Sequence, residues 1–302
     1  MGRSSKLVAF NFILLLFALA AAGAASEARA DQRARLDDPT LRMTLVDPGP
    51  VGAETTTNIY FAQVAVGGGY VTFFSLMNTG STAVNGTLFL TDQDGNPLNV
   101  DLADQATSSL GEGGRVDAVG SNFSIGPIAP GGTKFFRARA LTATDPQKSG
   151  WARVENRGGS LNGVAAFATL TPTGTLTTIA GVLSSSTMNV ATIPISDSLS
   201  GNTFTGYAVA NPGTGSITVK VVIVNSDGTF RTPSLNVPGL NPLGGGKQIA
   251  RFFFQDGIPS EFLGSAVLIG QSNAQFAVVA LIQAQGLLTA IPVIPEKAPA
   301  IN

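Results

Sequence analysis

The chain has 302 residues, of which 44% are hydrophobic, only 12% are charged and 36 are glycine, and its formal net charge is −1. This length is sufficient for two domains that each bury a core. The sequence contains no His and no Cys, which excludes disulfide bonds, Ser-His-Asp and Cys-His catalytic systems, and the usual zinc and copper sites.

The first 30 residues have the organisation of a secretory signal peptide. Arg3 and Lys6 precede an apolar run over residues 7–22, which small residues follow. Ala28-Arg29-Ala30 fits the pattern that signal peptidase cleaves, and the apolar run is short for a membrane span of about 20 residues. We therefore expect cleavage, a secreted or periplasmic product, and no membrane insertion of the mature chain.

Cleavage after residue 30 also changes the charge balance. It removes three basic residues and one acidic residue, which leaves 15 Lys and Arg against 18 Asp and Glu and a net charge of −3. A slightly acidic chain lacks the basic surface that nucleic-acid binding requires, so we expect no nucleic-acid partner.

Residues 31–58 are polar and rich in Asp, Pro, Gly and Thr, which is typical of a linker. Within them, residues 41–46 alternate: Leu41, Met43 and Leu45 fall on one face of an extended chain. Two interpretations stay open. The alternation is either chance within a linker, or an added strand that pairs with an exposed sheet edge of the same molecule or of a second copy, which would give a homo-oligomer.

From residue 59 onward, short β-type runs alternate with turn signals, and no segment sustains a helical period. The clearest run covers residues 217–224, where Ile217, Val219, Val221 and Ile223 occupy alternate positions. This pattern predicts an all-β chain of antiparallel sheets.

The same order of signals occurs twice along the chain. In both copies an Asn follows an apolar run, an Asp-Gly pair follows at the same distance, and a Gly-rich turn then precedes a run that contains Phe and Arg. An Asp-Gly pair after an alternating run predicts a tight hairpin turn. The repeat predicts two domains, residues 59–183 and 189–295, followed by a tail over residues 296–302.

In both halves, this order of motifs resembles a paired immunoglobulin-like β-sandwich module of large secreted bacterial proteins. The motifs are Asn78-Thr79-Gly80, Asn211-Pro212-Gly213, Asp94-Gly95, Pro130-Gly131-Gly132, Gly150-Trp151-Ala152 and the run Gly163-Val164-Ala165-Ala166-Phe167. The resemblance covers roughly residues 59–295 and implies two tandem immunoglobulin-like β-sandwich domains. It implies no activity, since none is assigned to that family. The second half has Ser265 in place of the Trp.

Three arginines and one tryptophan are the candidate ligand-binding residues. Arg137, Arg139 and Arg153 lie in two runs that gather most of the first half's positive charge. They predict either cross-strand ion pairs on a solvated sheet or a docking site for an anionic polysaccharide or a partner protein. Trp151, the only Trp, is either a plug in the core or a platform for a sugar ring.

Asp92, Asp94 and Asn96 offer spaced oxygen ligands and form a weak calcium candidate. The Gly stands at the fourth rather than the sixth place of a calcium loop, and Ala103 stands where the bidentate Glu belongs. The hairpin interpretation is therefore favoured, and we expect no metal and no cofactor.

Together these features predict a non-catalytic, secreted structural or adhesive β-sandwich protein with a protein or glycan partner at the cell surface. The alternative is a carbohydrate-binding accessory module.

Overall fold

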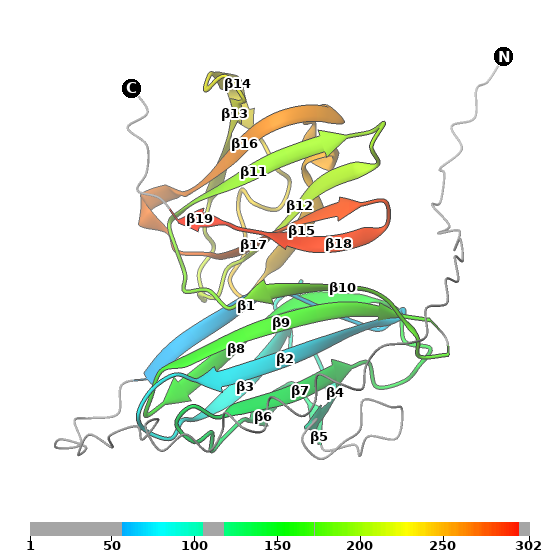
Figure 1. Ribbon diagram of the computed structural model, residues 1–302. Coiled ribbons are helices and arrows are strands. Elements are labelled where there is room, and N and C mark those ends of the chain that lie inside the picture. Colours follow the sequence, from blue (N-terminus) through cyan, green and yellow to red (C-terminus); the bar gives the residue numbers. More distant parts are fainter. Residues whose placement is uncertain (1–55, 105–117, 172, 296–302) are drawn as a thin grey trace, which may run out of the picture. The chain divides into compact units, whose positions relative to one another are not determined.

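The structure is a computed structural model that describes residues 56–104, 118–171 and 173–295. These residues form antiparallel β-sheets, and their helical pieces are two short 3₁₀ helices, η3 (Phe253–Asp256) and η4 (Gln271–Asn273) (Figure 1). The prediction of an all-β chain with antiparallel sheets is confirmed. The predicted signal peptide, residues 41–46 and the tail 296–302 lie outside the described residues.

The first half of the described chain contains two sheets. One has the strand order β1-β8-β3-β6 and the other the order β10-β9-β2-β7-β4-β5. The strands are β1 (Thr56–Val66), β2 (Tyr70–Asn78), β3 (Asn85–Asp92), β4 (Val100–Asp104), β5 (Ala118–Gly120), β6 (Asn122–Ser124), β7 (Thr133–Arg139), β8 (Lys148–Arg157), β9 (Leu161–Leu170) and β10 (Leu176–Leu183). The strand β1 thus begins inside the segment predicted as a linker.

The second half forms a sheet with the order β14-β13-β16-β11-β12-β17-β18, in which β15 also pairs with β12 and β19 with β11. The strands β11 and β12 meet only at Ser198 and Thr203. The strands are β11 (Val190–Ser198), β12 (Thr203–Ala210), β13 (Val219–Asn225), β14 (Phe230–Leu235), β15 (Gln248–Phe252), β16 (Glu261–Gly270), β17 (Ala277–Ala284), β18 (Leu287–Ile291) and β19 (Ile294–Pro295).

The order of pairing in one half recurs in the other. The neighbours β1-β8-β3 correspond to β11-β16-β13, and β10-β9-β2-β7 correspond to β18-β17-β12-β15. Both Asp-Gly pairs form tight turns, since Gly95 has a φ of 91° and Gly228 a φ of 85°. In each turn the glycine N–H donates to the carbonyl three residues earlier, on Asp92 and on Asn225.

The strand β13 shows how alternation selects the core. Val219, Val221 and Ile223 are buried in the core of the second half, as their spacing predicts. The strand begins two residues later than the predicted run, because Ile217 forms an isolated bridge with Leu243 instead. Full burial of one such side chain stabilises the fold by about 1.5–3 kcal/mol.

One hydrophobic cluster extends across both halves. It contains most of the buried apolar residues of the first half, including Phe61 and Phe74 in edge-to-face contact with ring centroids 5.4 Å apart, and also four residues of β12 and β17. Those four are Ala208, Ala210, Ala277 and Val279. The described residues are therefore held together by apolar packing between the halves as well as within each of them.

Two buried asparagines, Asn78 and Asn211, lie at equivalent positions at the ends of β2 and β12. The Asn78 Nδ2 donates to the carbonyls of Thr82 and Ile128 at 2.7 and 2.9 Å, and its Oδ1 accepts from the Gly80 N–H at 2.9 Å. Asn211 makes the same kind of contacts, with Gly215, Leu243, Gly244 and Gly213. This explains why an Asn follows the apolar run in both halves: its side chain adds hydrogen bonds that join separate loops at the end of the strand.

Substitution Asn78→Ala is expected to lower the free energy of unfolding by about 3 kcal/mol, because it removes three hydrogen bonds that a buried side chain makes. This corresponds to a fall in Tm of roughly 10 °C. Urea denaturation followed by circular dichroism measures the change. The control, Asn99→Ala, alters an exposed asparagine, and its effect should stay within about 0.5 kcal/mol. Equal effects of the two substitutions would contradict this role.

Candidate functional site

A cleft lies where the turn after β3 meets the turn before β15, and we call it the junction cleft. Its volume is about 400 Å³. Its polar lining consists of Gln93, Asp94, Ser216, Lys247 and Gln248, and Pro242, Leu243 and Ile249 form most of its apolar wall. Its lining residues come from both halves of the described chain.

Four hydrogen bonds fix the rims of the junction cleft. The backbone N–H of Gln248 donates to the Gln93 carbonyl at 3.0 Å. The side-chain Nε2 of Gln248 donates to the Ala62 carbonyl at 3.0 Å and to the Gln63 Oε1 at 2.6 Å. The Trp151 Nε1 donates to the Gly246 carbonyl at 2.7 Å. The start of β15 and the turn before it are therefore tied to the turn after β3 and to the strands β1 and β8.

The two turns approach so closely that a side chain at Gly95 would be crowded. A Cβ added at Gly95 would lie 3.2 Å from the Gly245 carbonyl oxygen and 3.4 Å from the Gly246 carbonyl carbon. Gly246, with a φ of 73°, also adopts the left-handed conformation. Sequence analysis explains these glycines only as turn residues, because the contact joins segments about 150 positions apart.

Trp151, one of the candidate ligand-binding residues, is buried at this junction. Only 5% of its surface is exposed, and its ring lies tilted against Tyr60 with centroids 6.4 Å apart. A sugar platform needs an exposed ring face, which Trp151 does not present. Its hydrogen bond to Gly246 shows instead that it joins the two halves.

Arg137 and Arg139 come together with Asp101 on the outer side of the six-stranded sheet. The Arg139 Nε contacts the Asp101 Oδ2 at 2.6 Å. Arg137 is only 8% exposed, and its Nε and Nη2 make no hydrogen bond with the described residues. Burial lowers the pKa of the Arg137 guanidinium, Arg139 lowers it further, and Asp101 raises it. The guanidinium stays charged at neutral pH, so positive charge is held beneath this surface.

Arg153 lies apart from the other two arginines. It belongs to β8 in the four-stranded sheet, whereas β7 belongs to the six-stranded sheet. Its guanidinium lies over the Phe89 ring at 4.5 Å and near Glu155 at 3.7 Å. The structure therefore brings together two of the three candidate arginines and gives the third a local ion pair and a cation–π contact.

The weak calcium candidate forms the turn that borders the junction cleft. The Asp92 Oδ1 accepts from the backbone N–H groups of Asp94 and Asn96 at 2.9 and 2.8 Å. This carboxylate thus caps its own turn. Over the described ranges, no three or more acidic residues are grouped so that they could hold a metal ion.

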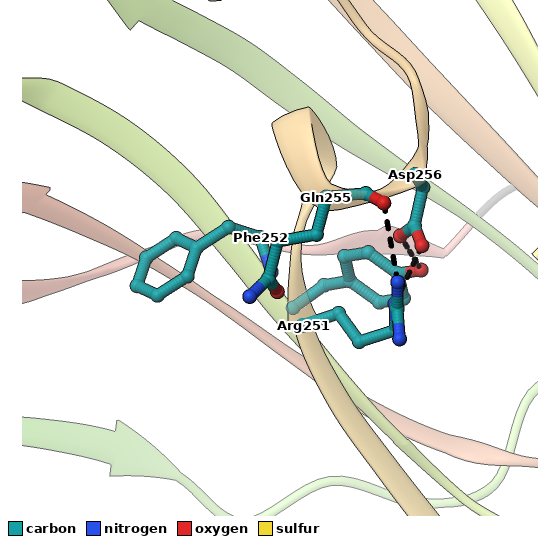
Figure 2. Close-up of polar contacts among 5 residues, drawn as sticks. Arg251, Phe252, Gln255 and Asp256 are labelled. Carbon is teal, nitrogen blue, oxygen red and sulfur yellow. Dashed lines mark hydrogen bonds and ion pairs between the residues drawn. The ribbon is translucent and has the colours of Figure 1, made fainter. Parts of the chain in front are cut away.

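A polar group that the sequence does not reveal joins β12, β15 and η3 (Figure 2). The Arg251 Nε contacts the Asp256 Oδ1 at 2.5 Å, and the Tyr207 hydroxyl donates to the Asp256 Oδ2 at 2.7 Å. Burial raises the pKa of Tyr207, and the hydrogen bond to Asp256 raises it further. Both carboxylate oxygens of Asp256 are occupied, so this group supports the 3₁₀ helix η3 and offers no free base.

Comparison with known proteins adds no relative. No protein-family model matches the chain, and neither the curated proteins nor the solved structures include a match. Among the helices of the described residues, none is long and apolar enough to cross a membrane.

The contact between the turns predicts a difference between two matched glycines. Gly228→Ala places a Cβ in open space, whereas Gly95→Ala presses it against the Gly245 carbonyl. Both variants carry the cost of a positive φ, about 1–2 kcal/mol. We expect Gly95→Ala to lower the free energy of unfolding by at least about 1 kcal/mol more than Gly228→Ala, because overpacking adds a second cost. Urea denaturation of both variants measures the difference, and equal losses would contradict the contact.

Proposed function

We propose that this chain is a non-catalytic, secreted or periplasmic protein of two tandem immunoglobulin-like β-sandwich domains, with a structural or adhesive role at the cell surface. The signal-peptide pattern of the first 30 residues supports export. The recurrence of one pairing order in both halves supports the tandem arrangement. The boundaries at residues 59–183 and 189–295 are part of this proposal.

The observation that carries the proposal is an apolar surface on the six-stranded sheet, which we call the outer face. Its residues alternate with core residues such as Leu76, Phe136 and Val182. Four large apolar side chains on it are exposed: Met77 by 44%, Phe135 by 46%, Ile179 by 46% and Leu183 by 74%. Exposed apolar surface that is grouped in this way is typical of sites where another protein docks.

The charge of the outer face supports a partner with an acidic surface. Arg137 pairs across strands with Phe73, and Arg139 pairs with Asp101. Among the described residues, Asp101 is the carboxylate whose charge acts on Arg137 and pairs with Arg139, so two positive charges meet one negative charge beside the apolar side chains. A protein that combines apolar and acidic residues would complement this face.

The absence of His and Cys from the sequence supports a non-catalytic role. The two carboxylates that lie closest to arginines, Asp101 and Asp256, are held in ion pairs.

Self-association by strand addition through residues 41–46 remains a proposal, which deletion of residues 31–50 followed by light scattering would test.

The alternative function is a carbohydrate-binding accessory module. The observation that favours it is the polar junction cleft, since Trp151 is not available as a platform. This alternative involves a different surface from the outer face, and the two can be tested separately.

Docking through the outer face predicts that Phe135→Glu reduces retention of the labelled mature chain on cells of the producing organism by at least about tenfold, because it places a charge within the apolar contact. Flow cytometry measures the retained fraction. The control, Phe230→Glu, alters a phenylalanine of β14 that is exposed to a similar degree, and it should bind as the unaltered chain does. Retention that is unchanged by Phe135→Glu would contradict the assignment of this face.

A further inference from the structure

We propose that the junction cleft is a binding site for one neutral sugar residue of a glycan. The inference rests on the alternative function, a carbohydrate-binding module, and specifies its site and ligand class. It does not depend on docking of a protein to the outer face. Its basis is the set of side chains that the two turns bring together.

The size of the cleft fits a ligand of this class. Its volume of about 400 Å³ lies toward the lower end of the range for small-molecule sites, about 300–1,000 Å³. It would hold on the order of ten water molecules, at about 30 Å³ each. A single sugar residue with its hydration fits this space, whereas a large cofactor does not.

The charges at the cleft favour a ligand that is neutral overall. Asp94 and Lys247 are both exposed, and neither the carboxylate nor the ammonium group makes a hydrogen bond or ion pair with another described side chain. One carboxylate supplies too few oxygens for a calcium site. One ammonium group, opposed by a carboxylate, is a weak basis for binding phosphate.

The hydrogen-bonding groups match hydroxyls. A hydroxyl group both donates and accepts, so it can pair with the Asp94 carboxylate, which only accepts, and with the Lys247 ammonium, which only donates. Gln93 and Ser216 can do both. A purely apolar ligand would leave these groups without partners, at a cost of about 1–3 kcal/mol for each.

An apolar wall completes the match. Pro242, Leu243 and Ile249 line the cleft beside the polar groups. A sugar ring has a face of C–H groups that can pack on such a wall while its hydroxyls point to the polar rim. The hydrogen bond from the Gln248 backbone to Gln93 joins the two sides of the cleft before binding, and the bond from the Gln248 side chain to Ala62 anchors Gln248 to β1, which reduces the entropy lost when a ligand binds.

The test is a ¹H–¹⁵N NMR titration of the mature chain, residues 31–302, with the methyl glycosides of glucose, galactose and N-acetylglucosamine, and with glucuronate as a charged comparison. At least one neutral glycoside should give saturable shifts at residues 93–95 and 246–249. Asp94→Asn and Lys247→Met should each weaken binding by at least about fivefold.

The matched control is Asp227→Asn, which alters the Asp-Gly turn of the second half, outside the cleft. It should leave the affinity unchanged. No shift with any of the three neutral glycosides, or equal losses in the Asp94 and Asp227 variants, would overturn the proposal. A third result would also overturn it: only glucuronate binds, and its binding is weakened by Lys247→Met but not by Asp94→Asn. That result would indicate an anion site.

This outcome is separable from the test of the outer face. Phe135→Glu should leave glycoside binding unchanged, and Asp94→Asn should leave retention on cells unchanged. Failure of the glycoside titration therefore does not affect the proposal of protein docking, and the reverse also holds.

Discussion

Apolar packing between the two halves of the chain is the contact on which the rest of the structure depends. The chain has no cysteine and few charged residues, so neither disulfides nor ion-pair networks can join the sheets. Instead, small side chains of β12 and β17, among them Ala208, Ala210 and Ala277, belong to the same buried cluster as the first-half core. Small residues at this surface allow the backbones to approach closely. The two halves therefore become one packed body across the described residues.

The junction cleft and the buried tryptophan follow from this packing. Once the halves are in contact, the turn after β3 and the turn before β15 meet at Gly95 and Gly246, and Trp151 fills the space beneath them. Polar side chains at the tips of both turns then line one cleft that neither half could form alone. The outer face has a different origin: it is the side of the six-stranded sheet that does not face the core. The chain thus offers two surfaces of different chemistry, one polar and concave, the other apolar with arginines beside it.

Local patterns in the sequence predict the elements of the fold, because those patterns act over a few residues. The alternation of Val219, Val221 and Ile223 predicts a half-buried strand, and each Asp-Gly pair predicts its turn. What the sequence does not reveal is which strands share a sheet. Arg137 and Arg153 lie in consecutive strands, β7 and β8, yet these strands belong to different sheets. Sheet membership depends on pairing between segments that are distant in the sequence.

The same limit applies to the candidate site. The partner of Trp151 is a carbonyl 95 positions away, and no local signal marks it.

The most direct test of a single packed body compares two probes of one urea denaturation of the mature chain. Fluorescence of Trp151, the only Trp, reports on the junction, and far-ultraviolet circular dichroism reports on all the strands. Packing between the halves predicts coincident transitions with one midpoint and one slope. A change in Trp151 fluorescence at clearly lower urea, with the β-sheet signal still intact, would show that the halves separate before they unfold and would contradict this account.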